Sequence, residues 1–161
     1  MMTETTASEL LELRMQVEID ATPEEVFDAY TDPRKQRLWL SALGPDDGAV
    51  ETTVDLRPGG RWEARFRPNP ETHVHDVQTY VEIDRPHRLV TDLVAASNIG
   101  GQEMPALETR IVLTFEPGGA GTVIAIEQSG FPTEQMRDFF RDVAWPGGFA
   151  RLGDQLRTRR G

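Results

Sequence analysis

The sequence contains no cysteine, and this absence excludes disulfides, thiolate catalysis and cysteine-based zinc sites. It also lacks an apolar run of about 18 residues, the length that a membrane-spanning helix needs, and a charged-then-apolar leader of the secretory type. Basic residues are few, because 17 Lys and Arg stand against 27 Asp and Glu and give a net charge of −10. Such a charge repels polyanions. We therefore expect a cytoplasmic protein that inserts into no membrane and binds no nucleic acid.

The sequence does contain enough apolar material for a folded core. Hydrophobic residues make up 38% of the 161 positions and charged residues 27%, a composition typical of a globular chain. A chain of this length usually forms one domain. The first eight residues, MMTETTAS, have no apolar pattern. We therefore predict a flexible tail over residues 1–10 and a single domain over residues 11–161.

Local patterns predict a strand followed by two short helices. The segment LELRMQVEI alternates apolar and polar side chains, as a half-buried strand does. Thr22 and Glu25 then have the spacing of a capping box, which marks the start of a helix. Asp32 followed by Pro33 repeats the start signal, because Asp caps a helix and Pro suits its first position.

Further segments alternate in the same way and indicate an antiparallel meander, since their connections are short. These segments are AVETTVDL, RWEARFR, THVHDVQTYVEID, RLVTDLV, LETRIVLTF and GTVIAIEQSG. The stretch 95–106 is polar and contains glycines, so we predict a mobile loop there. The sequence GPDDG predicts a turn earlier in the chain.

The end of the chain has the spacing of an amphipathic helix. Met136, Phe139, Phe140 and Val143 recur at intervals of three and four residues, which places them on one face. Pro146 follows directly and should kink or interrupt the helix, because proline has no N–H to donate and its ring clashes with the preceding turn.

Five stretches in this order resemble the helix-grip fold of the START-like, or SRPBCC, superfamily, in the branch related to the activator of the heat-shock protein 90 ATPase. They are ATPEEVFDAYTDPRKQRLWL, DLRPGGRW, YVEIDRPHRLV, GTVIAIEQSGF and WPGGFARLGDQL. The resemblance runs from about Leu13 to Leu156. It implies an α+β fold in which a curved antiparallel sheet of about six to seven strands, with two short helices, packs against a long C-terminal helix.

The resemblance also implies a function, because members of this superfamily enclose an elongated apolar cavity between sheet and helix. We expect this chain to bind a small apolar or amphipathic molecule there, without a cofactor. One alternative is a polyketide cyclase or aromatase-like enzyme that uses His73 or His75 for acid–base chemistry. The other is a cochaperone-like module that stimulates a heat-shock ATPase. Fold alone does not choose among them.

The two histidines lie on a strand whose alternation places them on one face with Val77, Thr79, Val81 and Ile83, and we expect this face to point inward. Histidines near a strand end are usually solvated or hydrogen-bonded to a neighbouring side chain. We prefer this interpretation of His73 and His75 to one in which they contact a ligand. A metal site needs a third ligand that no spacing supplies, so none is predicted.

The candidate ligand-binding residues combine polar groups expected in the cavity wall with aromatic and apolar groups expected around them. They are Trp39, Trp62, Phe66, His73, His75, Thr91, Thr109, Gln128, Met136, Phe139, Phe140 and Val143. Core packing is the default interpretation for Trp62, Phe66 and the helix residues, while Trp39 is the candidate for an entrance. The ligand, a homodimer and a chaperone partner are left open.

Overall fold

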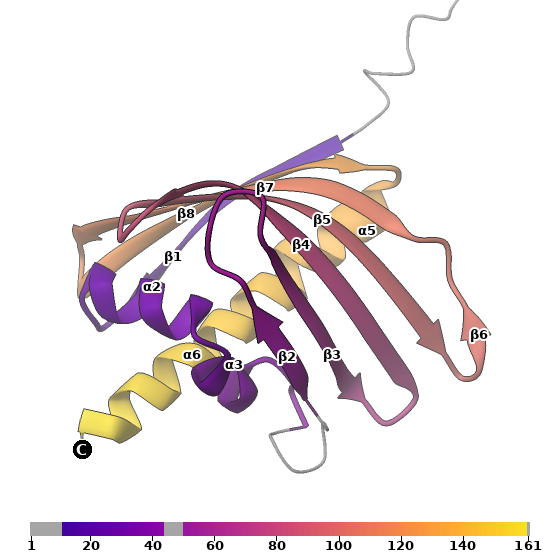
Figure 1. Ribbon diagram of the computed structural model, residues 1–161, viewed down its shortest axis with the longest axis horizontal. Helices are drawn as coiled ribbons and strands as arrows, with labels where there is room; N and C mark the ends of the chain where they lie inside the picture. Colours follow the sequence, from indigo (N-terminus) through magenta and orange to yellow (C-terminus); the bar gives the residue numbers. More distant parts are fainter. Residues whose placement is uncertain (1–10, 44–49, 161) are drawn as a thin grey trace, which may run out of the picture.

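The protein is an α+β fold in the computed structural model, which describes residues 11–43 and 50–160, with side chains through residue 158 (Figure 1). The predicted tail at 1–10 and the predicted turn GPDDG lie outside the described residues. The elements are β1 (Leu11–Ile19), α2 (Pro23–Thr31), α3 (Pro33–Trp39), β2 (Glu51–Val54), β3 (Arg61–Asn69), β4 (Thr72–Asp84), β5 (Arg88–Ile99), β6 (Gln102–Glu103), β7 (Leu107–Gly118), β8 (Gly121–Phe131), α5 (Glu134–Phe139), the π-helical segment η2 (Phe140–Ala144) and α6 (Trp145–Arg160).

The strands form one antiparallel sheet in the order β1-β8-β7-β5-β4-β3-β2, with β6 paired to β5 outside this path. The sheet curves over the C-terminal helical segments, which run diagonally across its concave side (Figure 1). Helices α2 and α3 lie on the same side. The predicted helix-grip fold is therefore confirmed, and β6 is the one strand of the described sheet that the sequence pattern does not indicate.

The prediction of a mobile loop over residues 95–106 is wrong for most of this segment. Strand β5 continues to Ile99 and turns back into β6. Gly100 and Gly101 make this possible, because both have positive φ angles, 60° and 89°, which a tight two-residue hairpin turn requires. The two glycines therefore form a tight turn between β5 and β6, where a long loop was predicted.

Both predicted helix starts are confirmed by their side-chain caps. The Thr22 hydroxyl accepts a hydrogen bond from the Glu25 amide (3.2 Å), and the Thr22 amide donates to the Glu25 carboxylate (2.9 Å). Asp32 Oδ1 accepts from the Arg34 amide (2.9 Å) at the start of α3. These caps satisfy N–H groups that have no partner within the helix.

The C-terminal helix continues through Pro146 without the predicted interruption, because its turn widens just before the proline. In η2 the Trp145 amide donates to the Phe140 carbonyl, five residues back. A π-turn of this kind adds one residue to the turn and removes the tight packing that proline would otherwise disturb. It also rotates the following residues, so Trp145 packs against the core while Val143 is 56% exposed.

The core lies between the concave face of the sheet and these helices. Its fully buried members come from several elements and include Phe27, Phe115, Ile124, Ile126 and Leu152. Four aromatic rings stack in sequence through this layer, from Trp39 to Tyr30, Phe149 and Trp145, with centroid distances of 5.6, 5.8 and 5.8 Å. None of the described helices is both long and apolar enough to cross a membrane.

Candidate functional site

The face of β4 that points into the molecule is the opposite of the predicted one. Strand β3 presents Trp62 and Ala64 to the core, and their partners across the ladder are Gln78 and Asp76. His75 pairs instead with the outward Arg65, and its Nε2 lies 2.7 Å from the Glu63 carboxylate.

His73 is exposed on that same outer face, because it lies two residues from His75 along a regular strand. The prediction that His73 and His75 face the interior is therefore wrong.

A β-bulge explains this error. Tyr80 pairs with Thr91 and Glu82 pairs with the next residue of β5, Val90, so Val81 has no partner across the ladder. One extra residue reverses the inward and outward positions on its two sides. Ile83 faces the core as predicted, but extending its alternation back through the bulge assigns every earlier side chain to the wrong face.

The inner face of β4 carries a set of polar side chains instead of histidines. We define the inner polar cluster as Tyr30, Asp76, Gln78, Tyr80 and Thr91. The Thr91 hydroxyl donates to Gln78 Oε1 at 2.7 Å, and Gln78 also hydrogen-bonds the Tyr30 phenol. The cluster therefore joins α2, β4 and β5.

Two atoms of this cluster are buried without a hydrogen-bond partner, Asp76 Oδ1 and the Tyr80 hydroxyl. Burial raises the pKa of the Asp76 carboxyl to about 7, because a charged carboxylate is disfavoured away from water. Burial also raises the pKa of both Tyr80 and Tyr30. At neutral pH the two phenols are neutral, and Asp76 is divided between its protonated and ionised forms.

Burial decreases along this face toward the end of β4 that carries the histidines. Tyr80 is 1% exposed and Gln78 is 6% exposed, whereas Asp76 and Val74 are only partly buried. Asp76 therefore lies at the boundary between the packed core and the more open end of the concave face. Phe66 on β3 is partly buried beside Val74, its partner across the ladder.

A second polar chain links the C-terminal helix to the sheet. The Trp145 indole N–H donates to Gln128 Oε1 at 2.8 Å, and Gln128 Nε2 donates to the Thr109 hydroxyl at 2.9 Å. Thr109, Gln128 and Thr91 all face the interior, as the sequence predicts. The oxygen and the nitrogen of the Gln128 amide both bond to protein partners. These hydrogen bonds therefore hold the helix against the sheet.

Both candidate tryptophans are built into the core. Trp62 donates its indole N–H to the buried Thr52 hydroxyl at 2.9 Å. Trp39 is 6% exposed and donates to the Ala29 carbonyl at 2.8 Å. The prediction that Trp39 stands at an entrance is therefore wrong, since its ring is stacked inside the aromatic layer.

The predicted inner stripe of the C-terminal helix is half correct. Met136 and Phe140 pack against the core, and the Phe140 ring lies 5.4 Å from that of Phe131 on β8. Phe139 is 53% exposed and, like Val143, points away from the core. Regular spacing predicts all four on one face, but only Met136 and Phe140, four residues apart, share the inner face, and the π-turn that begins at Phe140 changes the rotation that places Val143.

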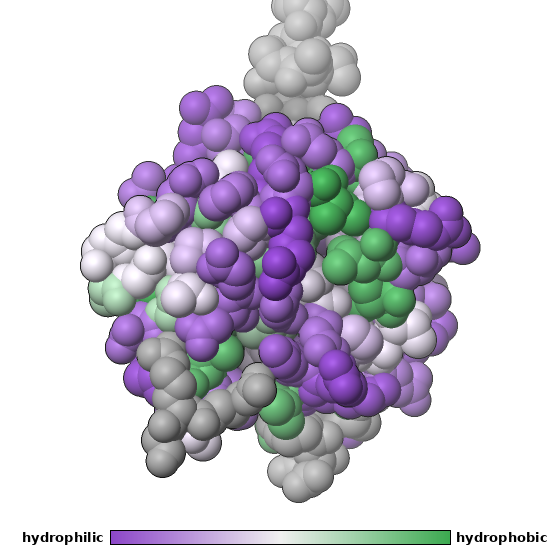
Figure 2. All heavy atoms as spheres, turned by 60° about the vertical axis from the view of Figure 1, so that its left-hand side comes forward, coloured by the Kyte–Doolittle hydropathy of each residue, from purple (hydrophilic) through white to green (hydrophobic). Residues whose placement is uncertain are grey.

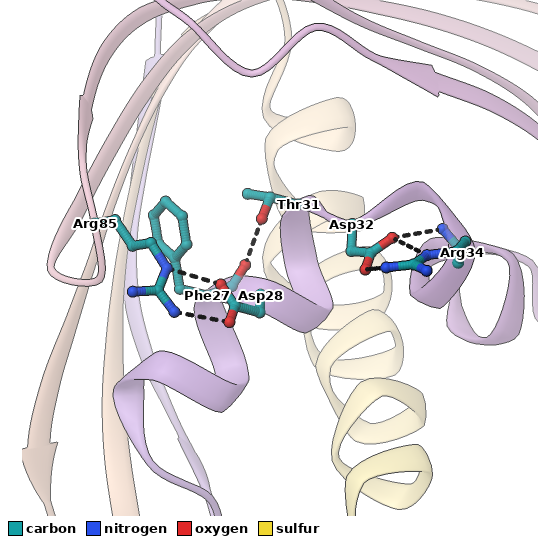
Figure 3. Close-up of polar contacts among 6 residues, drawn as sticks. All are labelled: Phe27, Asp28, Thr31, Asp32, Arg34 and Arg85. Carbon is teal, nitrogen blue, oxygen red and sulfur yellow. Dashed lines mark hydrogen bonds and ion pairs between the residues drawn. The ribbon is translucent and has the colours of Figure 1, made fainter.

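A separate groove of about 490 Å³ lies outside the core beside α2 and α3, and it is a weaker candidate for ligand binding. Its carboxylates already have partners in the close-up view: Asp28 accepts two hydrogen bonds from Arg85, at 2.9 and 2.8 Å, and Asp32 is bonded by Arg34 (Figure 3). The groove is open to solvent and polar along much of its length. We therefore place the candidate site at the inner polar cluster.

The outer surface supports this choice on the side shown in Figure 2. That side is mostly hydrophilic, and its hydrophobic residues gather in separate patches instead of one continuous band. Within the described part of the chain, no three His, Asp or Glu side chains converge in a way that could hold a metal ion.

Sequence reasoning missed Tyr30, Asp76, Gln78, Tyr80 and Trp145. A usable signal was Tyr80, because a large aromatic side chain on a strand usually packs inward. Giving Tyr80 the inner position would have placed Gln78 and Asp76 there too. Tyr30 and Trp145 carried no comparable signal, since their positions depend on how the helices dock.

Comparison with known proteins assigns the chain to a family. The model described as activator of Hsp90 ATPase homolog 1-like protein matches residues 20–157. No curated protein sequence matches the chain.

Solved structures share the fold. A protein of Rhizobium leguminosarum is 21% identical, over 92% of this chain and 95% of its own, with a TM-score of 0.71. A Rhodobacter sphaeroides protein is 21% identical, over 95% of both chains, with a TM-score of 0.68. CalU16 of Micromonospora echinospora is 24% identical, over 89% and 73%, with a TM-score of 0.54.

Proposed function

The chain belongs to the activator of Hsp90 ATPase homolog 1-like family, and from this premise we propose that it binds a small apolar or amphipathic molecule on the concave side of its sheet. The ligand lies between the inner faces of β3, β4 and β5 and the helices. Its apolar part contacts Phe66 and Val74, and its polar part meets the inner polar cluster. This mode needs no covalent chemistry.

The observation that carries the proposal is the pair of unpartnered atoms, Asp76 Oδ1 and the Tyr80 hydroxyl. Leaving a buried polar group without a hydrogen bond costs about 1 to 3 kcal/mol, so native proteins keep few of them. A ligand with polar atoms supplies the missing partners. A few such groups within an apolar surface are typical of small-molecule sites, where they fix the orientation of the bound molecule.

Native mass spectrometry of the purified protein tests first whether a small molecule accompanies it. Thermal unfolding with a library of apolar compounds then tests binding directly. A ligand present at about 100 times its Kd adds about 2.7 kcal/mol and should raise the Tm of a chain of this size by about 5 to 10 °C.

The matched variants are Val74→Phe and His75→Phe, which place the same ring on opposite faces of β4. Val74→Phe should abolish the rise in Tm because it narrows the inner face. His75→Phe should leave the rise intact. Equal loss in both variants, or no rise with any compound in the wild type, would contradict the proposal.

A second candidate function is proton transfer to a bound molecule, with Asp76 in place of the histidines. The observation that favours it is the pKa of about 7 of the Asp76 carboxyl, since an acid–base group works best when its pKa is near the working pH. Turnover of a cyclase-type substrate should then disappear in Asp76→Asn and persist in His73→Ala and His75→Ala. The reverse pattern would restore the histidine mechanism.

The family description names activation of the Hsp90 ATPase. A cochaperone role of this chain and a cytoplasmic location stay predictions. The direct test is the ATPase rate of purified Hsp90 with and without the protein, and an unchanged rate would remove this alternative.

A further inference from the structure

The inner polar cluster offers two hydrogen-bond donors to a ligand. Gln78 Oε1 already accepts from the Thr91 hydroxyl at 2.7 Å, and the Gln78 amide group bonds the Tyr30 phenol. The Tyr80 hydroxyl has a hydrogen to donate and no partner. A protonated Asp76 carboxyl adds a second donor.

Among the described side chains, no opposite charge favours the ionised form of Asp76. The side chains beside it on the inner face are Ala64 from β3 and Ala95 from β5, and neither can titrate. Among the described residues, the titratable group shown to interact with it is the phenol of Tyr30 from α2, which is neutral near pH 7. Burial alone accounts for the raised pKa of Asp76 among the described residues.

The two donors lie at different positions along β4. Asp76 and Tyr80 are four residues apart on β4, which separates their Cα atoms by about 13 Å along an extended strand. Asp76 lies at the more open end and Tyr80 in the packed core. A ligand that enters from the open end therefore meets Asp76 first, while its apolar body contacts Phe66 and Val74.

Resting on the proposed function, we infer that the Asp76 carboxyl donates a hydrogen bond to a carbonyl oxygen of a neutral, mostly apolar ligand. A carboxylate ligand is disfavoured, because it would bring a second negative charge beside Asp76 without a cation to balance it. A hydrocarbon would leave Asp76 Oδ1 unpartnered. Binding of a ketone or ester is consequently coupled to protonation, and affinity decreases as Asp76 ionises.

The experiment compares three probes of similar shape: acetylnaphthalene, ethylnaphthalene and naphthylethylamine. Their Kd values are measured by titration calorimetry at about pH 5.5 and about pH 8.5, on either side of the Asp76 pKa. The ketone should bind about 3- to 10-fold more tightly than the hydrocarbon at the lower pH, which is the value of one hydrogen bond. Its affinity should fall by about 3- to 10-fold at the higher pH, where the hydrogen bond is lost, while the affinity of the hydrocarbon changes little.

Variants assign the effect to Asp76. Asp76→Asn keeps a donor and removes the pH dependence, and Asp76→Leu removes the preference for the ketone. Asp92→Asn, on the outer face and paired with Arg110, is the matched control and should behave as the wild type. The infrared carbonyl band of the bound ketone should shift to lower frequency in the wild type only at the lower pH.

Each other result overturns the inference. Equal affinity for ketone and hydrocarbon would contradict the inference but not the proposed function. Tightest binding of the amine, with affinity that rises with pH, shows that ionised Asp76 pairs with a cation instead. If none of the three probes binds at either pH, both the inference and the proposed function fall.

Discussion

At the scale of single residues, the Asp76 side chain that we propose as a ligand contact also lowers the stability of the folded protein. Its Oδ1 is buried without a partner, and burial raises its pKa to about 7 from an ordinary value of 3.8. Between these two values the folded state holds a proton that the unfolded state has lost. The free energy of unfolding therefore decreases as pH rises through this window.

The first prediction is that Asp76→Asn stabilises the protein at high pH. Wild-type stability should fall by about 1 to 2 kcal/mol between about pH 5 and about pH 7.5 through this group, since each pKa unit corresponds to about 1.4 kcal/mol and part of the residue reaches solvent. The Asn variant should lack this decrease. Urea unfolding at several pH values measures it.

Asp92→Asn is the control for this prediction. The Arg110 guanidinium holds the pKa of the Asp92 carboxyl below its usual range, so its contribution is lost only on acidification. Asp92→Asn should keep the wild-type slope above pH 5. The same slope in the wild type and in Asp76→Asn would show that Asp76 titrates normally.

At the scale of elements, a single extra residue changes which side chains face inward, once in the sheet and once in the helix. Val81 forms the bulge in β4 and reverses the alternation before it. The π-turn in η2 does the equivalent in the helix, so that Trp145 packs inward while Val143 is exposed. The bulge directly follows Tyr80 of the inner polar cluster.

The second prediction separates the two adjacent phenylalanines. Phe140→Ala should destabilise the protein by about 2 to 4 kcal/mol, because it removes a ring that packs against the core at Phe131. Phe139→Ala should change stability by about 0.5 kcal/mol or less, because its ring is mostly in solvent. Urea unfolding of both variants measures the difference. Similar losses would mean that both rings share the inner face, as uninterrupted helical spacing predicts.

At the scale of the whole molecule, hydrogen bonds as well as the apolar core hold the C-terminal helix against the sheet. Trp145, Gln128 and Thr109 connect α6 to β8 and β7 in one hydrogen-bonded chain. Gln128 is fully buried, so each of its amide atoms needs a protein partner. This chain fixes where the helix lies across the sheet, and hence the shape of the concave side.

The third prediction tests this closure. Trp145→Phe removes the indole N–H and leaves Gln128 Oε1 buried without a donor, which should cost about 1 to 3 kcal/mol. Gln128→Leu should also destabilise, because the Thr109 hydroxyl loses its donor. The double variant should lose less than the sum of the two single losses. Strict additivity in urea unfolding would show that the two side chains act independently.

The sequence by itself determined the elements whose signals are local. Thr22 and Asp32 cap the helices that their spacing predicts. Strand β1 and the regular part of β8, from Thr122 to Ser129, present the predicted faces. Regular alternation and capping depend on neighbouring residues alone, so they could be predicted without knowing the fold.

Only the tertiary structure decided which side chains meet at the site. The face of β4 depends on pairing with β3 and β5 across the sheet, and the position of Trp145 depends on a π-turn that accommodates Pro146. These are contacts between residues far apart in the chain. Because a shift of one residue reverses a strand face or rotates a helix, small local differences that the sequence pattern does not reveal placed Asp76, and not His75, on the concave side.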